Sequence, residues 1–111
     1  MSKTYPLFEH WYKALDWILS SVEKFPRNAR FSLASRIAEL ALEAMELIIE
    51  AIYSKNRAIV LDKLNLNFEK LRVLFRIAHD RKYISVRQYE YISRIINEAG
   101  KMTGGWRKIS V

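Results

Sequence analysis

The sequence predicts an all-α protein, an antiparallel up-down-up-down four-helix bundle, and three observations indicate this fold. Apolar residues recur at spacings of three and four over four long stretches. The two prolines and three glycines of the 111 residues lie at the edges of those stretches. Strand-like alternation never extends beyond a few residues. Because short connections make consecutive helices antiparallel neighbours, we expect one bundle domain over residues 1–111.

The first two predicted helices span residues 7–24 and 31–53. Along the first, spacings of four, four, three and four place five apolar residues on one face: Leu7, Trp11, Leu15, Ile18 and Val22. Pro26 ends that helix, because the residue before a proline is disfavoured in helical conformation. The second is apolar on nearly all sides, which indicates burial. One polar ridge interrupts it, formed by Arg36, Glu39, Glu43, Glu46 and Glu50.

The third predicted helix, residues 57–82, carries two apolar stripes. The inner seam has the 3-4 spacing of a left-handed bundle and consists of Leu61, Leu64, Phe68, Leu71, Phe75 and Ala78. The second stripe lies on another side of the helix and consists of Ile59, Leu66, Val73 and Ile77. It predicts a second neighbour for this helix. That neighbour is either a thick core of the same bundle or another copy of the chain.

The fourth predicted helix spans residues 86–102. Ser85 and Gln88 have the spacing of a capping box at its start. Gly100 is placed to end or fray the helix, and the pair Gly104-Gly105 predicts a flexible basic tail over residues 103–111. Trp106 in this tail is placed either to stack on a nucleic-acid base or to dock against the end of the bundle.

The net charge of +7 is concentrated in the second half of the chain. Residues 1–54 carry 6 basic and 7 acidic side chains, a net charge of −1, whereas residues 55–111 carry 13 and 5, a net charge of +8. This asymmetry favours a polyanion or an acidic protein surface as partner, the alternative being a protein that is merely basic. The candidate nucleic-acid-binding residues are Lys63, Lys70, Arg72, Arg76, Arg81, Lys82, Arg87, Arg94, Lys101, Arg107 and Lys108. Arg72 and Arg76 share a helix face, although Glu69 is placed to neutralise Arg72.

Several other classes of protein are disfavoured. The chain has no cysteine, hence no disulfide framework, thiolate nucleophile or cysteine zinc site. Charged residues interrupt the first 30 positions and the most apolar stretch, residues 40–52, which argues against a signal peptide and a membrane span and favours a cytoplasmic protein. Neither histidine belongs to a Glu-x-x-His motif, no serine belongs to a recognisable triad, and no Gly-rich loop opens a helix. We therefore expect a protein without catalytic residues, metal or cofactor.

Four stretches of the sequence carry a family resemblance. They are Lys24 to Ile37, Asn67 to Ala78, Arg87-Gln88-Tyr89-Glu90, and Glu98-Ala99-Gly100-Lys101-Met102-Thr103-Gly104-Gly105-Trp106. In these stretches the chain resembles the accessory variability determinant (Avd) proteins of diversity-generating retroelements. It departs from them at Leu33-Ala34, where the family commonly has Leu-Gly.

The resemblance implies a four-helix bundle that assembles into a ring, a homopentamer, without catalytic activity. It implies binding of the reverse transcriptase and of template RNA or an RNA/DNA hybrid, in support of mutagenic cDNA synthesis. The matching cations would be Lys70, Arg72, Arg76, Arg87 and Lys101. Arg36 also lies in a matching stretch, but its position among the glutamates of the second helix favours a structural role. The alternative is an orphan structural or adaptor oligomer of a related group, the four-helix-bundle proteins encoded in intervening sequences of ribosomal RNA genes.

Overall fold

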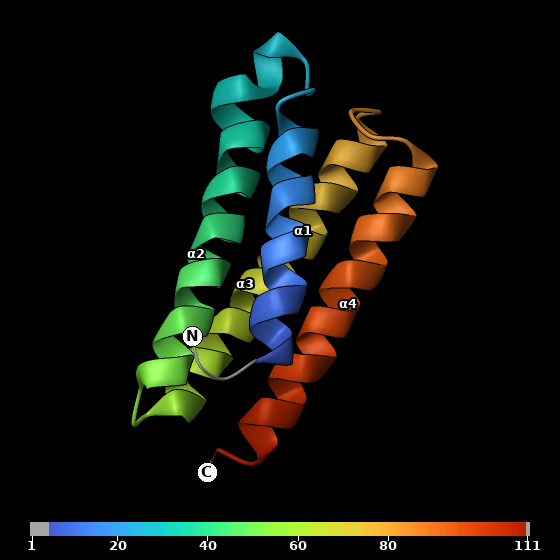
Figure 1. Ribbon diagram of the computed structural model, residues 1–111. Coiled ribbons are helices and arrows are strands. Elements are labelled where there is room, and N and C mark those ends of the chain that lie inside the picture. The colour runs from blue at the N-terminus through green and yellow to red at the C-terminus, as the bar shows by residue number, and fades with distance from the viewer. Residues whose placement is uncertain (1–4, 111) are drawn as a thin grey trace.

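The computed structural model describes residues 5–110, which form a bundle of four α-helices (Figure 1). α1 (Pro6–Val22) and α3 (Arg57–Asp80) run in one direction, and α2 (Ser35–Tyr53) and α4 (Val86–Lys108) run in the other. α1 and α3 each pack against both α2 and α4. The order around the bundle is therefore α1, α2, α3, α4. The predicted all-α four-helix fold is confirmed over the described residues, which contain no strand.

The core lies on the bundle axis and is built from the predicted apolar faces. All six residues of the inner seam of α3 are at most 1% exposed. Trp11 of α1 is fully buried; its ring centroid lies 4.8 Å from that of Phe68, and its Nε1 donates a hydrogen bond to the Ala41 carbonyl at 3.0 Å. This hydrogen bond ties α1 to α2 and satisfies the only polar atom of a large apolar side chain.

The connections shorten three of the predicted helices. α1 ends at Val22 and not at residue 24, because the amides of Lys24 and Phe25 bond to carbonyls only three residues back. A 3-10 turn (Arg27–Ala29) and a π-helical turn (Arg30–Ala34) follow, so α2 begins at Ser35 and not at residue 31. α3 ends at Asp80 and not at residue 82, because Lys82 has a φ of 62° and turns the chain out of the helix.

The prediction of a flexible tail is wrong over its described residues, since α4 continues through all three glycines to Lys108. The capping box of Ser85 and Gln88 at its start is confirmed. Trp106 docks against the bundle end: its ring centroid lies 5.7 Å from that of Tyr5, and the Arg57 guanidinium lies 5.1 Å above the ring. This docking stabilises the last turns of α4 despite the glycines. Val111, the last residue of the predicted tail, lies outside the described residues.

Candidate nucleic-acid interface

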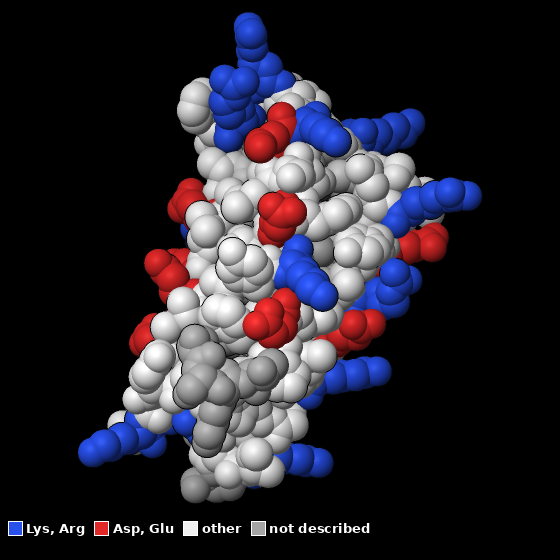
Figure 2. Space-filling model, in the orientation of Figure 1, with Lys and Arg blue, Asp and Glu red and all other residues white. Residues whose placement is uncertain are grey.

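Exposed cations gather at one end of the bundle. In an up-down-up-down bundle the α1–α2 and α3–α4 connections lie at the same end, the upper one in Figure 1. Within residues 23–35 and 80–88 the acidic residues are Glu23 and Asp80 alone. The six cations of these segments are all exposed and define what we call the basic end: Lys24, Arg27, Arg30, Arg81, Lys82 and Arg87. Figure 2 shows blue side chains projecting from this end of the molecule.

Half of the basic end was missed by the charge pattern of the sequence. Arg81, Lys82 and Arg87 are among the predicted residues, whereas Lys24, Arg27 and Arg30 belong to the half of the chain with a net charge of −1. The up-down-up-down topology predicts that these three cations lie near Arg81, Lys82 and Arg87, because it places the first and third connections at the same end of the bundle. The prolines and turn residues that mark those connections are visible in the sequence.

Arg81 is held in place by an aromatic neighbour. Its Nε donates a hydrogen bond to the Tyr83 hydroxyl at 3.0 Å, and its guanidinium carbon lies 5.7 Å from the Tyr83 ring centroid. This hydrogen bond, together with the Coulombic interaction with Tyr83, raises the pKa of Arg81 above its usual value. Arg81 therefore remains a fixed positive charge, with a guanidinium suited to bidentate phosphate contacts.

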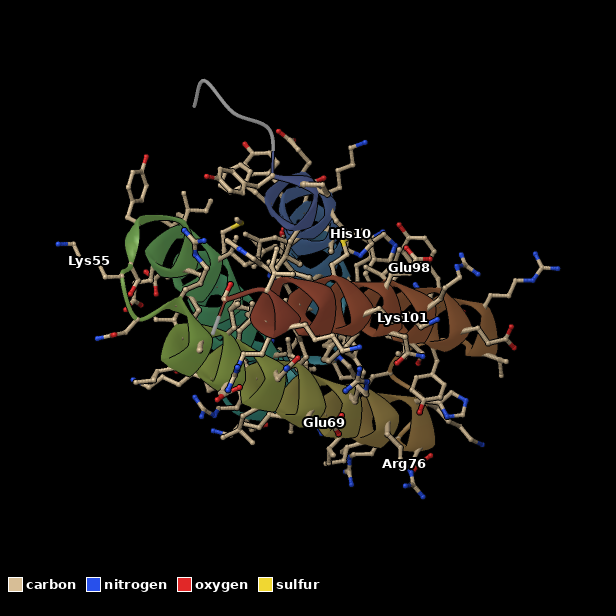
Figure 3. All side chains as sticks on the ribbon, turned by 90° about the horizontal axis from the view of Figure 1, so that it is seen from below. His10, Lys55, Glu69, Arg76, Glu98 and Lys101 are labelled. Atoms are coloured by element: carbon tan, nitrogen blue, oxygen red, sulfur yellow. The ribbon has the colours of Figure 1, made fainter. Side chains whose placement is uncertain are left out.

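Arg72 and Arg76 have different surroundings. Arg72 forms an ion pair with Glu69, as the spacing predicted, and its Nε donates a hydrogen bond to Asn97 Oδ1 on α4 at 3.1 Å. Its guanidinium is accommodated by Gly100, where an added Cβ would lie 3.0 Å from Nη2. Arg72 thus bridges α3 and α4. Arg76 is exposed on the outside of α3 (Figure 3) and forms no ion pair with any described residue.

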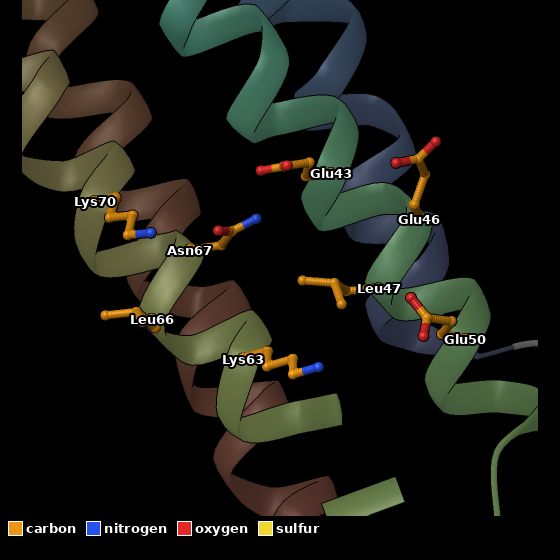
Figure 4. A pocket seen from close by; sticks show the side chains of 8 residues that line it. All are labelled: Glu43, Glu46, Leu47, Glu50, Lys63, Leu66, Asn67 and Lys70. Carbon is orange, nitrogen blue, oxygen red and sulfur yellow. The ribbon is translucent and has the colours of Figure 1, made fainter. Parts of the chain in front are cut away.

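Lys63 and Lys70 line a groove of about 410 Å³ between α2 and α3 (Figure 4). The other side of the groove is formed by α2 and carries three glutamates of the polar ridge, Glu43, Glu46 and Glu50. No ion pair joins these lysines to those glutamates within the described chain. A polyanion in this groove would meet the three carboxylates, so these lysines are poorly placed for nucleic acid.

The remaining predicted cations lie along α4. Arg94 and Lys101 border a shallow pocket of about 460 Å³ that also contains Glu90 and Glu98, and Figure 3 labels Lys101 and Glu98. The Arg94 guanidinium carbon lies 5.6 Å from the Tyr91 ring centroid. Arg107 forms an ion pair with Asp62 at 2.9 Å. Lys108 is exposed at the C-terminal end of α4, which is the end of the bundle opposite the basic end.

No group of three histidine, aspartate or glutamate side chains within residues 5–110 is arranged to hold a metal ion. Over the same residues, no helix has the length and apolar character needed to cross a membrane. Arg36, for which the neighbouring glutamates of the second helix predicted a structural role, pairs with Glu39 at 3.4 Å.

The fold and its charges define a class: a small helical bundle in which two helix connections at one end bring six exposed cations together. Comparison with protein families gives a match to a model described as bAvd-like, over residues 7–110. The chain belongs to the bAvd-like family, and the predicted resemblance is confirmed. No curated protein matches the chain. Membership in this family indicates an accessory, non-catalytic function in a diversity-generating retroelement.

Proposed function

We propose that this protein is a non-enzymatic accessory subunit that binds the reverse transcriptase and the template RNA of a diversity-generating retroelement. In the cytoplasm it supports mutagenic cDNA synthesis, and it acts as a ring of identical copies, a pentamer. The family match supports the retroelement context. The observation that carries RNA binding is the basic end, where two connections distant in sequence present their cations together.

The basic end suits a phosphate backbone better than the other cations do. Arg27 and Arg30 come from one connection and Lys82 and Arg87 from the other, and all four are exposed. None of them forms an ion pair with a described residue. Cations that bind phosphates release condensed counterions, so the affinity is largely independent of base sequence and falls as salt increases. The basic end thus provides affinity for RNA, while base pairing between template and cDNA provides sequence information.

Charge reversal at one residue of each connection, Arg27→Glu with Arg87→Glu, tests this site. Measured by fluorescence anisotropy with a labelled single-stranded RNA, the affinity should fall about tenfold or more at low salt. The slope of log affinity against log salt concentration should decrease by about 1 to 2, because each lost phosphate contact removes about 0.7 of slope. Arg87 stands in the first turn of α4, where a glutamate is favourable, so the variant should fold.

The control for this experiment is Lys13→Glu with Lys55→Glu. Both lysines are exposed and lie outside the basic end, and the double variant has the same net charge as the first. We expect its affinity to change by less than about threefold, as for a general charge effect. Equal losses in the two variants would overturn the assignment of RNA binding to the basic end.

The reverse transcriptase is tested separately. A reverse transcriptase gene beside a pair of near-identical repeats is the expected neighbourhood of the gene for this protein. The purified reverse transcriptase should then bind the full chain in size-exclusion chromatography, with and without template RNA. The absence of such a gene would favour the orphan-bundle alternative and would contradict the retroelement function.

A further inference from the structure

An apolar stripe remains exposed along α3. The α3 stripe is the second stripe predicted from the sequence: Ile59, Leu66, Val73 and Ile77. Leu66 is 56% exposed and Val73 is 55% exposed, so the described bundle does not cover the stripe. Of the two neighbours considered for this stripe, the core of the same bundle is therefore excluded, because no other described part of the chain covers the stripe.

A second apolar surface lies across α1 and α2, on the other side of the polar ridge. The α1–α2 face consists of Phe8, Tyr12, Leu15, Leu42, Ile49 and Tyr53. Tyr12 is 61% exposed and Leu42 is 45% exposed. Figure 2 shows white surface here, between red side chains along α2 and charged side chains along α1. Exposed apolar surface of this extent on two sides of one small bundle is typical of interfaces between proteins.

The two surfaces differ in the charges beside them. The charges beside the α1–α2 face are mostly carboxylates, Glu9 and Asp16 on α1, with Lys13 between them, and Glu39 and Glu46 on α2. On α3 itself, the charges next to the stripe in the groove are Lys63 and Lys70, which form no ion pair with a described residue, although ridge glutamates of α2 lie across that groove. The face thus carries an excess of carboxylates, and the α3 side of the stripe carries unpaired lysines. Such complementarity favours contact between unlike surfaces and disfavours contact between like ones.

We infer that a second copy of this chain covers the α3 stripe with its α1–α2 face. The inference rests on the self-association in the proposed function and names the surfaces that form it; it does not depend on RNA binding. In the contact, Leu66 and Val73 pack against Leu42 and Ile49 of the next copy, and Lys63 and Lys70 meet the carboxylates that border the face. The occupant is another copy because the complementary surface is present on this chain.

A contact between unlike surfaces repeats from copy to copy and closes into a ring when the angle allows. The α1–α2 side and the α2–α3 side are adjacent sides of the bundle, about 90° apart. In a closed ring the directions to the two neighbours differ by about 90° for four copies and about 108° for five. The polar ridge of α2 lies between the two contacts and faces the ring axis. The ring interior is therefore acidic.

Two variants test which surfaces meet. The face variant carries Leu42→Asp and Ile49→Asp, and the stripe variant carries Leu66→Asp and Val73→Asp. Each leaves one of its two surfaces intact and should be monomeric by sedimentation velocity at micromolar concentrations. An equimolar mixture should form a one-to-one dimer and nothing larger, because the stripe of the face variant can bind the face of the stripe variant.

The control is Val86→Asp, since Val86 is 58% exposed and lies outside both surfaces. This variant should assemble like the unmodified chain, and circular dichroism should show unchanged helix content in all variants. A mixture that stays monomeric, or either double variant that still assembles alone, would overturn the inference. If the unmodified chain is itself monomeric, self-association fails as well, whereas RNA binding by the basic end remains separately measurable.

Discussion

Gly100 illustrates how a single residue position joins two helices. It lies inside α4, and an added Cβ would lie 3.0 Å from Nη2 of Arg72, the far end of a flexible side chain. Gly100→Ala should raise the free energy of unfolding by about 0.5 kcal/mol, because alanine is about 1 kcal/mol better than glycine within a helix. Displacement of Arg72 from its exposed ion pair offsets part of that gain, by about 0.5 kcal/mol. Urea denaturation measures the difference.

The matched control is Gly104→Ala. An added Cβ at Gly104 meets nothing within 4 Å, so this variant should show the full gain of about 1 kcal/mol. The difference between the two variants then reports the contribution of the Arg72 bridge to Asn97 and Glu69. A free energy of unfolding for Gly100→Ala below that of the unmodified chain would contradict the predicted gain. It would mean that the Arg72 bridge contributes more to stability than an exposed ion pair normally does.

At the scale of the element, the end of α4 depends on one aromatic contact. Trp106 lies against Tyr5 and beneath the Arg57 guanidinium. Arg57 in turn donates hydrogen bonds to the carbonyls of Ala51 and Ile52 at the end of α2. Trp106 therefore joins the last turns of α4 to the N-terminal segment and to the α2–α3 connection.

Trp106→Ala should release these turns. We expect amide hydrogen exchange to accelerate over residues 103–110 and the free energy of unfolding to fall by about 1 to 2 kcal/mol, less than for a fully buried tryptophan. Lys108→Ala, an exposed position in the same helix end, should change neither quantity appreciably. Unchanged exchange in the Trp106 variant would show that the helix end is stable without the docked ring.

The four helices were predictable from the sequence because their buried faces follow the local spacing of apolar residues. The C-terminal end of α4 was not predictable in this way, because it depends on contacts with residues distant in sequence. The spacing of three and four residues from Leu61 to Ala78 directly reports a buried face. The glycines near residue 104 weaken a helix by about 1 kcal/mol each, but the docking of Trp106 against distant residues outweighs this. The basic end likewise required the topology, since Arg27 and Arg87 are 60 positions apart in sequence yet lie at the same end.

At the scale of the whole molecule, the bundle is elongated, with extents of 42 × 24 × 22 Å. Both the α3 stripe and the α1–α2 face run along its helices, so copies joined through them lie side by side with their long axes parallel. All basic ends then lie on one rim of the ring, while the acidic ridges face the interior. A long RNA would contact several basic ends at once, and binding at several linked sites raises the apparent affinity without new contacts.

The stripe variant, Leu66→Asp with Val73→Asp, separates this effect from the site itself, because it retains every cation of the basic end. Its affinity for an RNA long enough to span several copies should fall about 100-fold, whereas its affinity for a short RNA that fits one basic end should be unchanged. Fluorescence anisotropy with the two RNAs measures both affinities. Equal losses for the long and the short RNA would show that the substitutions damage the site, and equal affinities for both RNAs in the unmodified chain would contradict a rim of cooperating basic ends.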